Sequence, residues 1–195
     1  MIVNDELKFA FIAIPKTACT SVQRYFNPAP QDPEPPIYHM DIKTMSIEYP
    51  QVLNYYKFAF VRNPWDRFVS AYHNFTQDSG HFYWSYPLLK YKNFEDFCLN
   101  FENCESKNLL HFRPQFTFIS IDEKNVMNYI GKYENLNEDF EMIKRTLNIQ
   151  NNKILEKHRV SKHEKYTHLY TEEMKKVLER VYAQDIEMFK YTFGE

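Results

Sequence analysis

Two short apolar runs in the first third of the chain predict two buried strands. Residues 8–14 (KFAFIAI) and 57–62 (KFAFVR) are almost continuously apolar, a pattern typical of strands that are buried on both faces of a parallel sheet. Each run is followed by a turn that contains a proline, Pro15 or Pro64, and then by a segment with helical periodicity. The pattern therefore predicts two strand–turn–helix units.

The rest of the chain continues this alternation. Residues 117–121 and 127–133 are candidate strands, and residues 93–101 and 137–147 are typical of amphipathic helices with asparagine caps and acidic first turns. A last helix is predicted over residues 171–189. Strands that alternate with helices predict an α/β fold, with a central parallel sheet flanked by helices on both faces.

Length, composition and charge restrict the classes of protein that fit. A chain of 195 residues is expected to form a single domain over 1–195. Hydrophobic residues make up 44% and charged residues 26%, which excludes a disordered chain. The formal net charge of −2 argues against a nucleic-acid partner, because sequence-independent binding needs a broad cationic face.

The cysteines and the N-terminus bear on metals and on location. The spacing of the three cysteines fits neither a disulfide framework nor a zinc site; they are Cys19, Cys98 and Cys104. No other cluster of metal-ligating residues has the spacing of a metal site, so no metal is expected. Asp5 and Glu6 stand where a signal peptide would carry positive charge. No run approaches the roughly 18–20 apolar residues of a membrane span. We therefore expect a cytoplasmic protein without a transmembrane segment.

The first segment that carries chemistry is residues 9–21 (FAFIAIPKTACTS), where a buried strand runs into a tight loop and a helix start. The loop holds Lys16 and the hydroxyls of Thr17, Thr20 and Ser21 near backbone N–H groups and a helix N-terminus. This combination suits an anion such as a phosphate, and the alternative is a solvated surface loop. It is not a Walker A loop, because the GxxxxGK[ST] pattern is absent.

The second segment is residues 58–72 (FAFVRNPWDRFVSAY). Arg62 lies at the end of its strand, and Ser70 lies one to two turns into the following helix. Open parallel sheets bind ligands at the carboxyl ends of their strands, so Lys16 and Arg62 would hold two anionic groups of one ligand. For Arg67 we expect an ion pair with a helical neighbour instead.

Both segments resemble motifs of sulfotransferases that use 3′-phosphoadenosine 5′-phosphosulfate (PAPS). IPKTACTS is similar to the family's 5′-phosphosulfate loop, and VRNPWDRFVSAY is similar to its 3′-phosphate motif. The resemblance continues through HFRPQFTFI (111–119), YIGKYENLNEDF (129–140) and VYAQDIEMFKYTF (181–193), and it is strongest for the carbohydrate branch, which includes heparan and chondroitin enzymes and short bacterial relatives. The sequence departs from the family at Ala18-Cys19, where the loop often carries Gly-Gly.

The resemblance implies a P-loop-like three-layer fold and roles for individual residues. Lys16 would contact the 5′-phosphosulfate and its bridging oxygen, while Arg62 and Ser70 would hold the 3′-phosphate. Amides and hydroxyls for the 5′ end would come from the rest of the loop, namely Thr17, Ala18, Cys19, Thr20 and Ser21. The segment SKHEKY resembles the late loop that closes over the nucleotide, and its implied contacts are Ser161, Lys162 and Tyr166. Five Lys and Arg residues against two Glu in residues 153–165 would also favour an anion there.

Transfer to a hydroxyl requires a base near Lys16. Of the seven histidines, His39 follows a proline-rich loop (residues 27–36) and a short β-like run, so it could lie at a strand's carboxyl end. In the related branch a histidine at this place serves as the base. His111 is the second candidate, and carboxylates such as Asp41 are the third.

The sequence thus predicts an enzyme that transfers a sulfuryl group from PAPS in line to a hydroxyl acceptor, expected to be a carbohydrate, and that releases 3′,5′-ADP. One alternative is a nucleotide or small-molecule kinase of P-loop type, which would need a GK[ST] loop and a carboxylate for Mg²⁺. Another is a nucleotide-binding module without catalysis. The acceptor and the oligomeric state stay open, since acceptor contacts are expected on loops 28–40 and 77–89.

Overall fold

The computed structural model describes residues 1–27, 39–77, 88–156 and 165–195. The chain divides into two compact units, each built from two separate stretches: residues 1–62 with 115–160, and residues 63–114 with 161–195. The single domain expected from the sequence stays a prediction.

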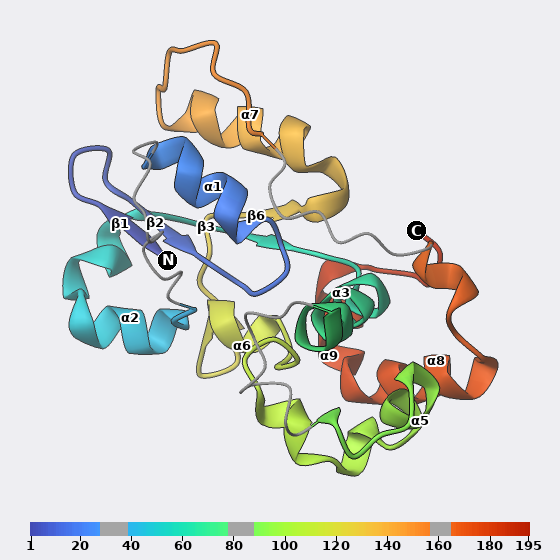
Figure 1. Cartoon of the computed structure of the whole chain (residues 1–195). Helices are drawn as coiled ribbons and strands as arrows, with labels where there is room; N and C mark the ends of the chain where they lie inside the picture. The colour runs from blue at the N-terminus through green and yellow to red at the C-terminus, as the bar shows by residue number, and fades with distance from the viewer. Residues whose placement is uncertain (28–38, 78–87, 157–164) are drawn as a thin grey trace. The chain divides into compact units, whose positions relative to one another are not determined.

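The first unit is built around a four-stranded sheet of order β1-β2-β3-β6. The strands β2 (Phe9–Ile12), β3 (Tyr56–Val61) and β6 (Tyr129–Lys132) run parallel, and β1 (Ile2–Asn4) pairs with β2 in antiparallel orientation (Figure 1). Because β2, β3 and β6 are parallel neighbours, their carboxyl ends meet at one edge of the sheet.

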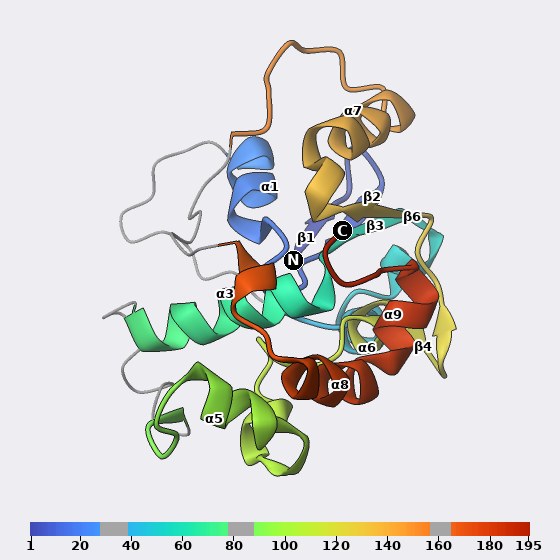
Figure 2. The ribbon, with the colours of Figure 1, turned by 90° about the vertical axis from the view of Figure 1, so that its right-hand side faces the viewer.

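Helices cover both faces of this sheet. Figures 1 and 2 show α1 (Cys19–Phe26) and α7 (Leu136–Thr146) on one side, and α2 (Ile42–Glu48) and α6 (Phe116–Ile119) on the other. The first pair of helices packs on phenylalanine rings that alternate along the strands, namely Phe9, Phe11, Phe58 and Phe60. Every residue of β2 is buried, which explains its continuous apolar run. The α/β fold predicted from the sequence is confirmed.

The end of β6 is held against its neighbours by a glycine and a carboxylate. A Cβ atom on Gly131 would lie 2.4 Å from a ring carbon of Phe60, so only glycine fits without a shift. On α7, Asp139 accepts hydrogen bonds from the N–H of Lys132 (2.6 Å) and from the hydroxyl of Tyr129 (2.9 Å). Burial, reinforced by that carboxylate, raises the pKa of Tyr129 to about 12. These contacts fix the backbone at the carboxyl end of β6.

The second unit is helical and has an aromatic core. Its helices are α3 (Pro64–Gln77), α5 (Phe94–Leu99), α8 (Glu172–Val181) and α9 (Ala183–Phe189). The ring of Phe68 lies 4.8 Å from that of Phe101 and 5.3 Å from that of Phe112, measured between centroids. Asn93 caps α5 as predicted, because its side chain accepts from the N–H of Asp96.

Three sequence predictions about local structure were wrong. Residues 117–121 do not form one strand, because the helical turn α6 is followed by the two-residue strand β4 (Ser120–Ile121), which pairs with β5 (Lys124–Asn125). The periodicity of so short a run cannot separate a strand from a helical turn. The residue before α7 is Asn135, whose side chain makes no capping bond, so the expected cap at Asn137 is not found.

The third correction concerns the last predicted helix, 171–189, which is broken into α8 and α9 at Tyr182. The Tyr182 side chain is 1% exposed, and its hydroxyl donates a 2.7 Å hydrogen bond to the carbonyl of Phe112. This tertiary contact overrides a helical pattern that is continuous in the sequence. Across the described ranges, no helix combines the length and the apolar character that crossing a bilayer requires.

Candidate functional site

Several residues with suitable chemistry lie at the carboxyl ends of the parallel strands in the first unit. Lys16 follows β2, Arg62 follows β3, and Tyr133 follows β6 directly. His39, from a distant part of the chain, contacts the carbonyl of Ala13 just after β2. The edge where these strands end is the usual ligand side of an open parallel sheet (Figure 1).

The turn between β2 and α1 has the backbone geometry of an anion cradle. Lys16 and Ala18 both have φ 69°, in the left-handed region, while Thr17 between them does not have positive φ. Such alternation turns successive N–H groups toward one concave side, where an anion can bind. Ala18 is the N-cap of α1 and makes no side-chain capping bond, so the helix presents its first amides at the same point.

Burial alternates along this loop, so its side chains form a half-buried set and a buried set. Lys16, Ala18 and Thr20 are half-buried, whereas Thr17, Cys19 and Ser21 are buried. The Thr17 hydroxyl and the Cys19 thiol both donate to the carbonyl of Ile14, at 2.8 and 2.7 Å. Burial raises the pKa of the Cys19 thiol. The side chains of Thr17 and Cys19 therefore hold the loop together, and an anion would meet their backbone amides.

The left-handed conformation of Ala18 leads to a prediction about stability. A left-handed backbone costs a non-glycine residue roughly 1–2 kcal/mol, and glycine avoids that cost but gains about 0.4–1 kcal/mol of entropy in the unfolded chain. We expect Ala18→Gly to leave the free energy of unfolding unchanged or to raise it by up to about 1.5 kcal/mol, as measured by urea denaturation. The matched control is Ala71→Gly in the buried middle of α3, which should lower it by about 1 kcal/mol. Equal losses at both positions would contradict the prediction.

Arg62 is placed by contacts to both neighbouring strand ends. Its guanidinium carbon lies 4.2 Å from the centroid of the Tyr133 ring, and Nη1 donates a 3.3 Å hydrogen bond to the carbonyl of Lys16. The residue is only 6% exposed. A planar, permanently charged guanidinium held beside the Lys16 loop suits a phosphate. Tyr133 was not among the predicted site residues, although its position directly after a candidate strand could have indicated a role.

His39 lies in the segment that precedes α2, with its Nδ1 2.7 Å from the carbonyl oxygen of Ala13. A carbonyl only accepts, so Nδ1 carries the hydrogen, and in the neutral ring Nε2 is then the basic nitrogen. Asp41 has an ordinary structural role, because its carboxylate accepts from the N–H of Thr44 and caps α2. The other candidate base, His111, belongs to the second unit, where its ring packs against Phe75.

The remaining predicted site residues belong to the second unit. Ser70 is buried on α3. The hydroxyl of Tyr166 donates to the carbonyl of Glu195 and accepts from the N–H of Gly194, so this residue anchors the C-terminal segment. Ser161 and Lys162 lie outside the described residues. The roles of these residues toward a nucleotide stay predictions.

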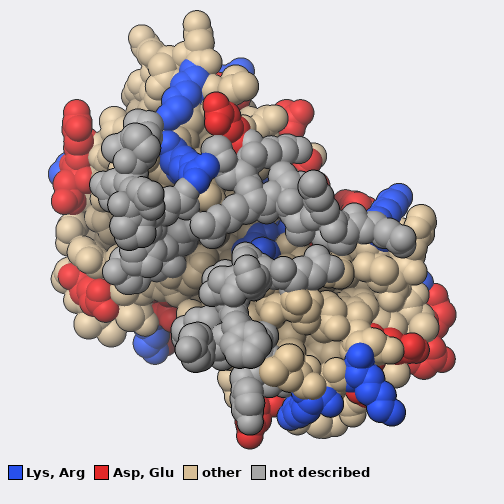
Figure 3. Space-filling view, in the orientation of Figure 1, with Lys and Arg blue, Asp and Glu red and all other residues tan. Residues whose placement is uncertain are grey.

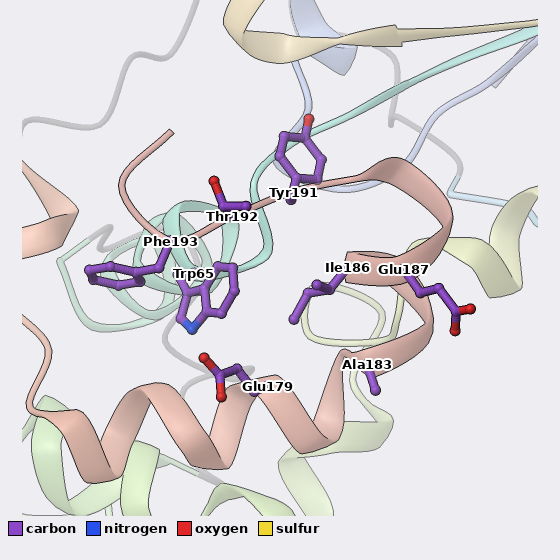
Figure 4. Close-up of a pocket in the computed structure, with 8 residues that line it drawn as sticks. All are labelled: Trp65, Glu179, Ala183, Ile186, Glu187, Tyr191, Thr192 and Phe193. Atoms are coloured by element: carbon purple, nitrogen blue, oxygen red, sulfur yellow. The ribbon is translucent and has the colours of Figure 1, made fainter.

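The second unit also contains an open cavity of about 400 Å³ (Figure 4). Its lining includes Trp65, Ile186, Tyr191 and Phe193 with the carboxylate of Glu179, and none of the predicted site residues is part of it. On the face drawn in Figure 3, Lys and Arg side chains are interspersed with Asp and Glu, in keeping with the net charge of −2. Among the described residues, no three or more His, Cys, Asp and Glu side chains are grouped as for a metal ion.

Comparison with known proteins agrees with this geometry. The model of the sulfotransferase family matches residues 1–192, which includes both segments with phosphate-binding character. Searches of curated proteins and of solved structures gave no match. The family match therefore rests on almost the whole chain.

Proposed function

The chain belongs to the sulfotransferase family, whose enzymes transfer a sulfuryl group from PAPS, and from this premise we propose that it sulfates a hydroxyl group of a carbohydrate and releases 3′,5′-ADP. The single observation that best supports this proposal is the convergence of the Lys16 loop, Arg62 and His39 at one edge of the first unit's sheet. The carbohydrate acceptor is supported by the resemblance of residues 111–119 and 129–140 to the carbohydrate branch.

The chemistry of these residues fits the two anionic ends of the donor. The loop of alternating backbone conformation and the Lys16 ammonium suit the 5′-phosphosulfate. The Arg62 guanidinium suits the 3′-phosphate, with Ser70 as a second proposed contact. Lys16 and Arg62 both lie in short turns after buried strands, which favours a site that is organised before the ligand binds.

In the proposed mechanism the protein orients the reactants and moves one proton. The acceptor oxygen attacks sulfur as the bond from sulfur to the bridging phosphate oxygen breaks. His39 accepts the hydroxyl proton at Nε2, while the carbonyl of Ala13 holds its Nδ1–H and fixes the ring. Lys16 stabilises the negative charge that develops on the departing phosphate.

Ligand binding provides the first test of the proposal. At about 100 times its Kd, 3′,5′-ADP should stabilise the native state by about 2.7 kcal/mol. For a chain of this length that corresponds to a rise in Tm of about 5–10 °C, measured by differential scanning calorimetry. 5′-AMP and ATP with Mg²⁺ should give much smaller shifts. An equal or larger shift with Mg²⁺-ATP would favour the kinase, and an acceptor screen with labelled PAPS then tests for a carbohydrate product.

A further inference from the structure

We propose that Gln115 is a positioning residue of the donor site, which sets the place of the Arg62 guanidinium by holding the Arg62 backbone. The inference rests on the proposed function, because it assumes that Arg62 binds the donor's 3′-phosphate. Gln115 precedes α6 and is fully buried, so its side-chain amide needs partners inside the protein.

Two reciprocal hydrogen bonds join the Gln115 side chain to the main chain of Arg62. The N–H of Arg62 donates to Oε1 over 2.9 Å, and Nε2 donates to the carbonyl of Arg62 over 2.8 Å. The amide therefore acts on the backbone as a neighbouring strand would.

The sheet itself does not hold Arg62 at this point. The pairing of β3 with β2 ends at Ala59, and its pairing with β6 ends at Val61 opposite Lys132. Arg62 is thus the first residue beyond the ladder, where a buried N–H and a buried carbonyl need other partners. Gln115 supplies both and extends the ordered backbone of β3 by one residue, which is the residue that carries the guanidinium.

Side-chain chemistry explains why this position holds an amide. The contact requires one donor and one acceptor, which a neutral carboxamide offers and an ionised carboxylate does not. With its backbone fixed, Arg62 reaches the Tyr133 ring at 4.2 Å and the carbonyl of Lys16 at 3.3 Å. A looser backbone would spread the guanidinium over several positions and weaken any contact that depends on its direction.

The other end of β3 offers a matched control. There the N–H of Lys57 donates to Oδ1 of Asn128, and the N–H of Asn128 donates to the carbonyl of Lys57, both over 2.8 Å. This contact also fixes a strand end, but it lies five residues from Arg62, about 16 Å along an extended strand. Loss of the Asn128 side chain should therefore affect stability without affecting the donor site.

The test compares Kd values for 3′,5′-ADP and 5′-AMP, measured by isothermal titration calorimetry, because only the first ligand carries the 3′-phosphate. We expect Gln115→Met to weaken 3′,5′-ADP binding by about five- to tenfold, the worth of roughly one hydrogen bond, and to leave 5′-AMP binding within about twofold. In an Arg62→Ala background, Gln115→Met should not raise the Kd for 3′,5′-ADP any further. Asn128→Ala should lower Tm and keep the ratio of the two Kd values.

The variant Gln115→Glu tests the same contact if Gln115→Met does not fold. An ionised carboxylate can accept from the N–H of Arg62 but cannot donate to the carbonyl of Arg62, so at pH 8 this variant should weaken 3′,5′-ADP binding by about five- to tenfold and leave 5′-AMP binding within about twofold. Equal losses for both nucleotides, or a full additional loss in the Arg62→Ala background, would overturn the inference alone. Retention of the wild-type preference in Arg62→Ala would overturn the proposed role of Arg62, and the inference with it.

Discussion

Replacement of Arg62 by alanine should weaken binding of 3′,5′-ADP by about ten- to a hundredfold. A hydrogen bond to a charged group is worth roughly 1.5–3 kcal/mol, and each 1.4 kcal/mol is a factor of ten in Kd. Arg62 is well placed for such bonds, because its guanidinium is held over Tyr133 and beside the carbonyl of Lys16. Isothermal titration calorimetry with 3′,5′-ADP measures the loss directly.

Arg67 provides the matched control for Arg62. It is the same residue type five positions later, lies on α3, and is only 1% exposed within the second unit. The sequence predicts an ion pair for it, so Arg67→Ala should lower the free energy of unfolding by about 2–3 kcal/mol, the upper end of ordinary substitutions. Its affinity for 3′,5′-ADP should stay near wild type. A folded Arg62→Ala protein with unchanged affinity would remove Arg62 from the proposed site.

The parts of the fold that the sequence predicts well are those with strong local signals. The buried strands β2 and β3 follow from apolar runs, and α3 begins at Pro64 as the position of that proline indicated. The break of the last predicted helix at Tyr182 could not be predicted from the sequence in the same way. It depends on a hydrogen bond to Phe112, 70 residues away in the chain, which no local window contains.

The same distinction applies to the candidate site. Lys16 and Arg62 stand out in the sequence because Arg62 directly follows a buried strand and Lys16 lies in the short turn after another. Gln115 lies 53 residues from Arg62, and the sequence offers no local sign that its amide completes the end of β3. The left-handed conformation of Ala18 is equally hidden, since an alanine in a sequence gives no indication of positive φ. Pairings through space therefore define the parts of the site that sequence reasoning missed.

Replacement of His39 by alanine should separate chemistry from binding. A base acts on the acceptor's proton and not on the nucleotide, so His39→Ala should lower the transfer rate by about 10²–10⁴-fold and leave 3′,5′-ADP affinity nearly intact. Lys16→Ala should reduce both quantities, because Lys16 is proposed to contact the donor and to stabilise the leaving phosphate. Single-turnover assays with labelled PAPS measure the rate, and calorimetry measures the affinity.

Two further measurements connect this effect to the imidazole of His39. With Nδ1–H held by the carbonyl of Ala13, only the neutral ring has a basic Nε2, so wild-type transfer should rise with pH as the ring loses its proton. The control is Asp41→Asn, two residues away. Asparagine caps a helix as well as aspartate does, so this substitution keeps the cap of α2 and removes only the carboxylate. That variant should keep the wild-type rate and pH profile. If a folded His39→Ala protein retains most of its activity, another residue accepts the proton. Loss of activity in Asp41→Asn would then assign the base to Asp41. If Asp41→Asn is active as well, His111 is the next residue to replace.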